Sequence, residues 1–165
     1  MMRMFSRKPQ PAIKELQDVP QCSIGAPLPI VLAEEHYLAL VYLAESFERD
    51  WDGVPRLVGL DTGREAAITI RFQRPRLHKL GPPNEEGIST HPLARHGLQA
   101  HGAFEAYNTE LLQKVARMTA HRHFVFSFRD STLEVIAKDY SVEKTDNTSV
   151  LAAAGAVLDS WSESQ

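Results

Sequence analysis

The sequence predicts an α+β protein whose mostly antiparallel, meander-like sheet carries one or two helices packed on one face. The clearest observation is residues 121–140, where Phe124, Phe126 and Phe128 share one face and the alternation resumes with Leu133, Val135 and Ala137 after a polar turn. This period of two is typical of a half-buried antiparallel hairpin. Short turns between successive strands favour antiparallel neighbours. A closed β-barrel carrying a helix is the alternative topology.

Five further segments are predicted as strands. Residues 28–32 read as an edge strand because Pro27 and Pro29 flank and interrupt them. Residues 37–44 are apolar on both faces, which indicates a central strand, although so short an apolar run also fits a buried helix. The other segments are residues 56–60, residues 102–107 and residues 66–73, the last with alternate residues expected to face water.

Helical spacing is found in three places. Residues 12–19 fit two helical turns closed by Pro20. After residues 102–107, Asn108 is placed to cap a helix whose apolar residues are Leu111, Leu112, Val115 and Met118. Asn147 or Thr148 is expected to cap a final helix with a buried stripe formed by Val150, Leu151, Ala154, Val157, Leu158 and Trp161.

Length and composition indicate one ordinary globular domain. For the 165 residues we predict a flexible leader or short helix over residues 1–20 and a single α+β domain over residues 21–162. A net charge of −3 gives no overall attraction to nucleic acid or anionic lipid. The single cysteine, Cys22, excludes an internal disulfide and predicts a reducing, cytoplasmic location. The longest apolar run, residues 37–44, is far shorter than the ~20 residues that span a membrane.

Residues 74–100 break the strand pattern, because prolines and glycines interrupt every run long enough for a regular element. A loop of this length in a compact domain is commonly functional. It contains or adjoins four histidines, and two more open the late hairpin: His78, His91, His96, His101, His121 and His123. With Glu85, Glu86 or Glu105 they could form a divalent-metal site, but no HExxH spacing occurs. We therefore predict neither a metal nor a cofactor.

Basic residues form a local patch that consists of Arg64, Arg71, Arg74, Arg76 and Lys79, against the single acid Glu65. From this patch and the hairpin turn we take Arg71, Arg74, Arg76 and Arg129 as candidate anion-binding residues. A solvated charged face is the simpler interpretation. The patch has no interleaved aromatic residues for stacking on bases, so nucleic-acid binding is not expected.

The sequence carries no GxSxG, Walker or dinucleotide-binding motif. The leading hypothesis is therefore a small non-enzymatic binding or accessory domain that acts through a protein partner or as a homo-oligomer, away from membranes, in a bacterial regulatory or defence system. The competing hypothesis is a hydrolase-like enzyme with candidate catalytic residues His91, His123, Asp130 and Glu134. In it, His91 or His123 is the general base, Glu134 or Asp130 orients that base, and Arg129 holds an anion. A pocket shared by these residues would favour the enzyme.

Three pieces of the chain together carry a resemblance: Trp51-Asp52-Gly53, then Gly81-Pro82-Pro83-Asn84-Glu85 leading to His91-Pro92-Leu93, and then His123-Phe124-Val125-Phe126 continuing to Asp130-Ser131-Thr132. Over about residues 25–140, the sequence resembles a group of small bacterial proteins with no assigned function. The resemblance implies a bacterial cytosolic origin and a compact domain, and it implies no particular chemistry.

Overall fold

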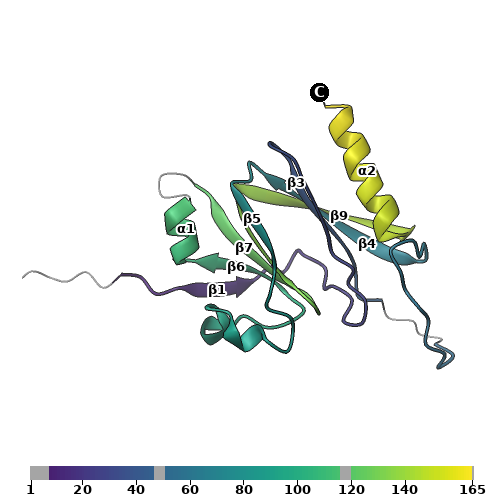
Figure 1. The fold of residues 1–165 in the computed structure, drawn as a ribbon, viewed down its shortest axis with the longest axis horizontal. Helices are drawn as coiled ribbons and strands as arrows, with labels where there is room; N and C mark the ends of the chain where they lie inside the picture. The colour runs from purple at the N-terminus through teal and green to yellow at the C-terminus, as the bar shows by residue number, and fades with distance from the viewer. Residues whose placement is uncertain (1–7, 47–50, 116–119, 165) are drawn as a thin grey trace, which may run out of the picture.

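The computed structural model describes residues 8–46, 51–115 and 120–164, and these form nine strands in two antiparallel sheets (Figure 1). The five-stranded sheet has the order β1 (Ala12–Glu15), β6 (Ala103–Tyr107), β7 (Arg122–Ser127), β8 (Thr132–Ala137) and β5 (Leu77–Gly81). The four-stranded sheet has the order β2 (Ile30–Ala33), β3 (Leu38–Leu43), β4 (Glu65–Gln73) and β9 (Asp139–Thr148). The helices are η1 (Ile88–Thr90), η2 (Ala94–His96), α1 (Glu110–Val115) and α2 (Val150–Ser162).

The inner faces of the two sheets pack against each other and form the main core. Alternate residues of β3 and β4, such as Leu40 and Ile70, contact the aromatic side of β7, including Phe124 and Phe126. Strand β8 adds Leu133, Val135 and Ala137 from the same face. This arrangement follows from the period-two pattern, because every second side chain of a strand points to the same face.

The outer face of the four-stranded sheet is covered by α2, which crosses it on the far side from β7 (Figure 1). Val41 of β3 and Ala67 of β4 pack in one cluster with Val150, Ala154 and Val157 of the helix. The hydroxyl of Ser149 accepts a hydrogen bond from the backbone N–H of Ala152 at 3.0 Å and caps the helix.

The outer face of the five-stranded sheet is covered differently. The segment that contains η1 and η2 places Leu93 and Leu98 on Phe104, Ala106 and Val125, and this forms a smaller third cluster. The short helix α1 lies over the same sheet (Figure 1). This face therefore has a loop and a short helix as its cover, and buried polar residues lie beneath them.

The α+β class is confirmed, and the strands predicted at residues 28–32, 37–44, 66–73, 102–107 and in the 121–140 hairpin are present as β2, β3, β4, β6, β7 and β8. Strand β2 is an edge strand and β3 a buried central strand, as expected. The strands divide between two sheets, however, and the described residues form no closed barrel. The two α-helices, α1 and α2, cover different sheets.

Several local predictions were wrong. Residues 12–19 do not form two helical turns, because residues 12–15 pair with β6 as strand β1. Residues 56–60 are irregular, and the predicted irregular stretch 74–100 contains β5 as well as η1 and η2. Strand β9 was missed because its side chains are mostly polar and largely exposed. Residues 1–7 of the predicted leader lie outside the described residues.

The expected caps and faces also differ in detail. Thr109, and not Asn108, accepts the capping hydrogen bond of α1 from Leu112, and Ser149 caps α2 in place of Asn147 or Thr148. Met118 lies outside the described residues. Leu151 and Leu158 of the expected stripe are about half exposed. The side of β4 predicted to face water is buried at Ala67 and Thr69, and Ala67 packs in the α2 cluster.

Candidate functional site

A buried cluster of two histidines and one glutamate lies on the outer face of the five-stranded sheet. Because Phe124 and Phe126 point into the core, His123 of β7 points to the opposite face. Glu134 of β8 stands opposite Val125 in the register, so it shares this face with His123 as a diagonal neighbour. His91, which follows η1, completes the cluster from above the sheet.

Glu134 joins the two imidazoles. Its Oε1 lies 2.5 Å from Nε2 of His91, and its Oε2 lies 3.3 Å from Nε2 of His123. The side chains of His91 and His123 are 6% and 2% exposed, and that of Glu134 is 18% exposed. The carboxylate is therefore held between two rings with little access to water.

The environment of His91 fixes its tautomer. The backbone N–H of Leu93 donates to Nδ1 of His91 at 3.1 Å, so Nδ1 must present a lone pair. The ring proton of the neutral imidazole is then on Nε2, where it donates to Glu134. Both nitrogens of His91 are thus occupied, and its role is to hold Glu134 in position.

His123 has a different pair of neighbours. Its Nδ1 lies 2.8 Å from Oγ1 of Thr109, and its Nε2 faces Oε2 of Glu134. The contact to Glu134 is close enough for an ion pair, but Nε2 is buried without a well-aligned hydrogen bond in the described part of the chain. A lone pair on Nε2 would face a carboxylate oxygen, so the proton of the neutral ring belongs on Nε2 and Nδ1 is left basic.

The charge state of Glu134 follows from the same contacts. Burial by itself would raise the pKa of its carboxyl group, but His123 and His91 outweigh that effect and hold the pKa well below its usual range. Glu134 is therefore an anion at neutral pH. A fixed negative charge next to His123 stabilises the imidazolium that forms when this ring accepts a proton.

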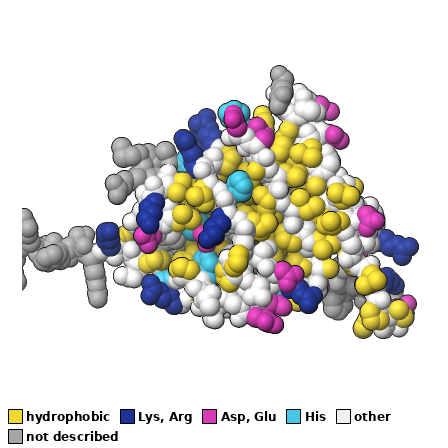
Figure 2. All heavy atoms as spheres, viewed as in Figure 1, with side chains coloured by type: hydrophobic (Ala, Val, Ile, Leu, Met, Phe, Trp, Pro, Cys, Tyr) yellow, Lys and Arg dark blue, Asp and Glu magenta, His cyan; other side chains and the backbone are white. Residues whose placement is uncertain are grey.

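The cluster opens into a pocket of about 320 Å³, within the range of small-molecule sites. His91, Thr109, His123 and Glu134 contribute polar groups, and the apolar part of the lining comes from Pro11, Pro92, Leu93 and Leu111. Arg95 and the Glu110–Lys114 ion pair complete the lining. Figure 2 shows histidine, acidic and basic side chains close together on the side of the molecule that carries α1.

Of the four predicted catalytic residues, the structure brings together His91, His123 and Glu134. Asp130 lies in the exposed turn between β7 and β8 and does not line this pocket. The predicted anion-binding arginines do not converge on it either. Arg71 pairs with Glu143 at 2.7 Å, and Arg129 donates to the carbonyl of Gly25 at 2.9 Å. Arg74 and Arg76 are exposed and line a separate open depression of about 550 Å³.

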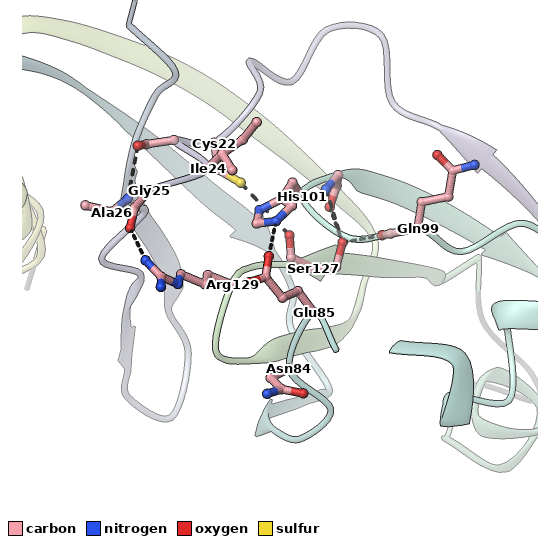
Figure 3. Close-up of polar contacts among 12 residues, drawn as sticks. Cys22, Ile24, Gly25, Ala26, Asn84, Glu85, Gln99, His101, Ser127 and Arg129 are labelled. Carbon is pink, nitrogen blue, oxygen red and sulfur yellow. Dashed lines mark hydrogen bonds and ion pairs between the residues drawn. The ribbon is translucent and has the colours of Figure 1, made fainter. Parts of the chain in front are cut away.

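A second histidine–carboxylate pair, formed by His101 and Glu85, occurs elsewhere, close to residues 22–26 (Figure 3). Nε2 of His101 lies 2.6 Å from Oε2 of Glu85, and Cys22 lies next to the ring (Figure 3). His101 and Cys22 line a cavity of only about 40 Å³, which is too small for a substrate. Burial raises the pKa of the Cys22 thiol to about 11, so the thiol stays protonated and is not an activated nucleophile.

Thr109 is the site residue that the sequence did not reveal. Its position after a strand and before a helix indicates a cap, and it does accept a hydrogen bond from the backbone N–H of Leu112 at 3.1 Å. The contact with His123 depends on how α1 folds over the sheet. No spacing rule links residue 109 to residue 123.

A metal does not fit the tautomer that the hydrogen bonds of His91 imply. To bind a metal through Nε2, His91 would need its proton on Nδ1, where the N–H of Leu93 already points. No group of three or more potential metal ligands is found among the described residues.

None of the described helices is long and apolar enough to cross a bilayer.

Comparisons with known proteins add no family or activity: no family model matches the chain, and neither a curated protein nor a solved structure is significantly similar to it.

Proposed function

We propose that this protein is a hydrolase-like enzyme in which His123 is the general base and Glu134 orients it. The observation that carries the proposal is the position of Glu134, whose two carboxylate oxygens face the Nε2 atoms of His91 and His123 at the edge of one pocket. Buried carboxylate–imidazole pairs that open into a concave site are typical of acid–base catalysis.

Each residue has a distinct role in the proposed reaction. His91 fixes the carboxylate, the carboxylate fixes His123, and Nδ1 of His123 takes a proton from a hydroxyl group that attacks the substrate. The imidazolium that results is stabilised by Glu134 and later returns the proton to the leaving group. The apolar lining gives the uncharged part of a substrate a place to bind.

The test is the hydrolysis of a panel of p-nitrophenyl esters by the full chain and by His123→Asn. Asparagine keeps a polar atom near the position of Nδ1 but cannot act as a base, so we expect a loss of about 10²–10⁴-fold. The matched control is His101→Gln, which alters the other buried histidine–carboxylate pair and should leave hydrolysis unchanged. Equal rates of ester hydrolysis for the wild-type protein and His123→Asn would refute the proposal.

Protein contact is the second candidate function, and one observation favours it. Residues 51–60 expose four large apolar side chains, those of Trp51, Val54, Leu57 and Leu60, and Leu57 is fully exposed. This segment contacts the start of α2, where the N–H of Leu151 donates to the carbonyl of Leu60 at 3.0 Å.

Light scattering over a range of concentrations tests self-association through residues 51–60. A mass that rises with concentration in the wild-type protein, but not in Leu57→Asp, would support it.

A further inference from the structure

We propose that Thr109 is the nucleophile of this site and forms a covalent ester with the acyl group of its substrate. This inference rests on the proposed function, because it needs His123 as the base. It adds the identity of the attacking group and limits the substrates to carboxylic esters and related acyl compounds.

The contacts around Thr109 are those of an activated hydroxyl. Its Oγ1 lies 2.8 Å from Nδ1 of His123, which is the nitrogen left basic by the contact between Nε2 and Glu134. The same oxygen accepts a hydrogen bond from the N–H of Leu112, so its own proton is free to point at His123. A nucleophile within hydrogen-bond reach of a base, with that base oriented by a third group, is the general arrangement for covalent catalysis.

In the described part of the chain, Thr109 is the hydroxyl that contacts the basic nitrogen of His123. Thr109 and His123 are 4% and 2% exposed, yet both line the pocket. In the free protein the threonine hydroxyl occupies the hydrogen-bonding position at Nδ1 of His123. The threonine is therefore the group from which His123 first takes a proton.

The proposed reaction has two steps. In the first, Oγ1 of Thr109 attacks the carbonyl carbon of an ester while its proton passes to Nδ1 of His123. The bond to the alcohol then breaks, and the alcohol leaves with the proton from His123. In the second, water attacks the acyl-threonine, gives its proton to His123 and releases the acid, and the proton returns to Oγ1. The pocket's apolar side chains, Pro11, Pro92, Leu93 and Leu111, suit an uncharged acyl group.

The test is covalent labelling of the full chain with a dialkyl fluorophosphate, followed by peptide mass spectrometry. The probe forms a bond from phosphorus to an activated hydroxyl and releases fluoride. We expect one label per chain, on Thr109, and no label on His123→Asn. Thr109→Ser should still be labelled. Thr109→Asn keeps a side-chain oxygen that can cap α1 but has no hydroxyl, so it should fold normally and stay unlabelled.

Two results would overturn the assignment of Thr109. One is a label at another residue, and the other is ester hydrolysis by a folded Thr109→Asn variant at the wild-type rate. If Thr109→Asn hydrolyses esters and His123→Asn does not, the assignment of Thr109 as the nucleophile is wrong, while the assignment of His123 as the general base is still supported. If the wild-type protein neither hydrolyses esters nor takes the label, this inference and the proposed function both fail.

Discussion

The outer faces of the two sheets are built from the same kind of strand, but only that of the five-stranded sheet combines an apolar cluster with buried histidine and threonine and a partly buried glutamate. On the four-stranded sheet, Ala39, Val41, Leu43 and Ala67 meet apolar residues of α2, and these residues are buried. On the five-stranded sheet, buried His123 and Thr132 and the partly buried Glu134 take the equivalent outward positions. Burying such groups costs free energy unless each one is hydrogen-bonded. Buried titratable side chains beside a pocket are therefore candidates for a functional site.

The largest effect expected from this comparison is on the apolar outer face of the four-stranded sheet. Leu43→Ala removes a fully buried side chain beneath α2 and should lower the free energy of unfolding by about 2–5 kcal/mol. Urea denaturation measures this loss. Leu158→Ala is the matched control, because Leu158 is 50% exposed and should change stability by no more than about 0.5 kcal/mol. Similar losses in both variants would mean that α2 does not pack as described.

The second prediction concerns the polar face. Glu134→Gln keeps the shape of the side chain but removes its charge, so the bond to His91 loses its charge-assisted character. We expect a loss of about 1–3 kcal/mol in stability, together with a strong loss of ester hydrolysis. Leu43→Ala measured near neutral pH, at a temperature where it is folded, should keep its hydrolytic rate. If Glu134→Gln lost stability but kept full activity, the cluster would be purely structural.

The third prediction is a dependence on pH. Because the pKa of Glu134 is lowered in the folded state, its ionised form stabilises the protein at pH values above the ordinary glutamate pKa of about 4.3. This contribution is lost as the pH falls below that value toward the folded-state pKa. The stability difference between the wild-type protein and Glu134→Gln should therefore shrink as the pH falls below about 4.3. A difference that grows over that acidic range would contradict the assignment of charge.

The smallest effect is expected at the ion pair between Arg71 and Glu143 on the four-stranded sheet. Their side chains are 35% and 59% exposed, so Arg71→Ala should lower the free energy of unfolding by only about 0.2–1 kcal/mol. The loss should decrease further in high salt. A loss as large as that of Leu43→Ala would show that this pair is better shielded from water than its exposure indicates.

The sequence predicts the parts of the fold in which burial leaves a periodic pattern. Strands β3, β4, β7 and β8 and helix α2 each bury one or both faces, so their apolar residues recur at the strand or helix period. Strand β9 leaves no such signal, because it pairs with β4 through its backbone while most of its side chains are exposed. Strand β1 is only four residues long and was mistaken for helix.

The candidate site was predictable in part. His123 and Glu134 lie on the polar side of an obvious hairpin, and His91 lies in a segment that the sequence marked as irregular. Asp130 was included because its residue type and position in the hairpin suited the chemistry, but the turn carries it away from the pocket. Thr109 could not be found from sequence, because its contact with His123 arises when α1 folds over the sheet.

The central claim is that Glu134 and Thr109 leave His123 with a basic Nδ1 and a protonated Nε2. Imidazole ¹⁵N–¹H NMR of the histidine side chains at neutral pH tests it most directly. We predict that the neutral rings of His91 and His123 carry their protons on Nε2, and that the His123 signals change in Glu134→Gln. A proton on Nδ1 of neutral His123 would contradict the account, because that nitrogen could not then accept the proton of Thr109.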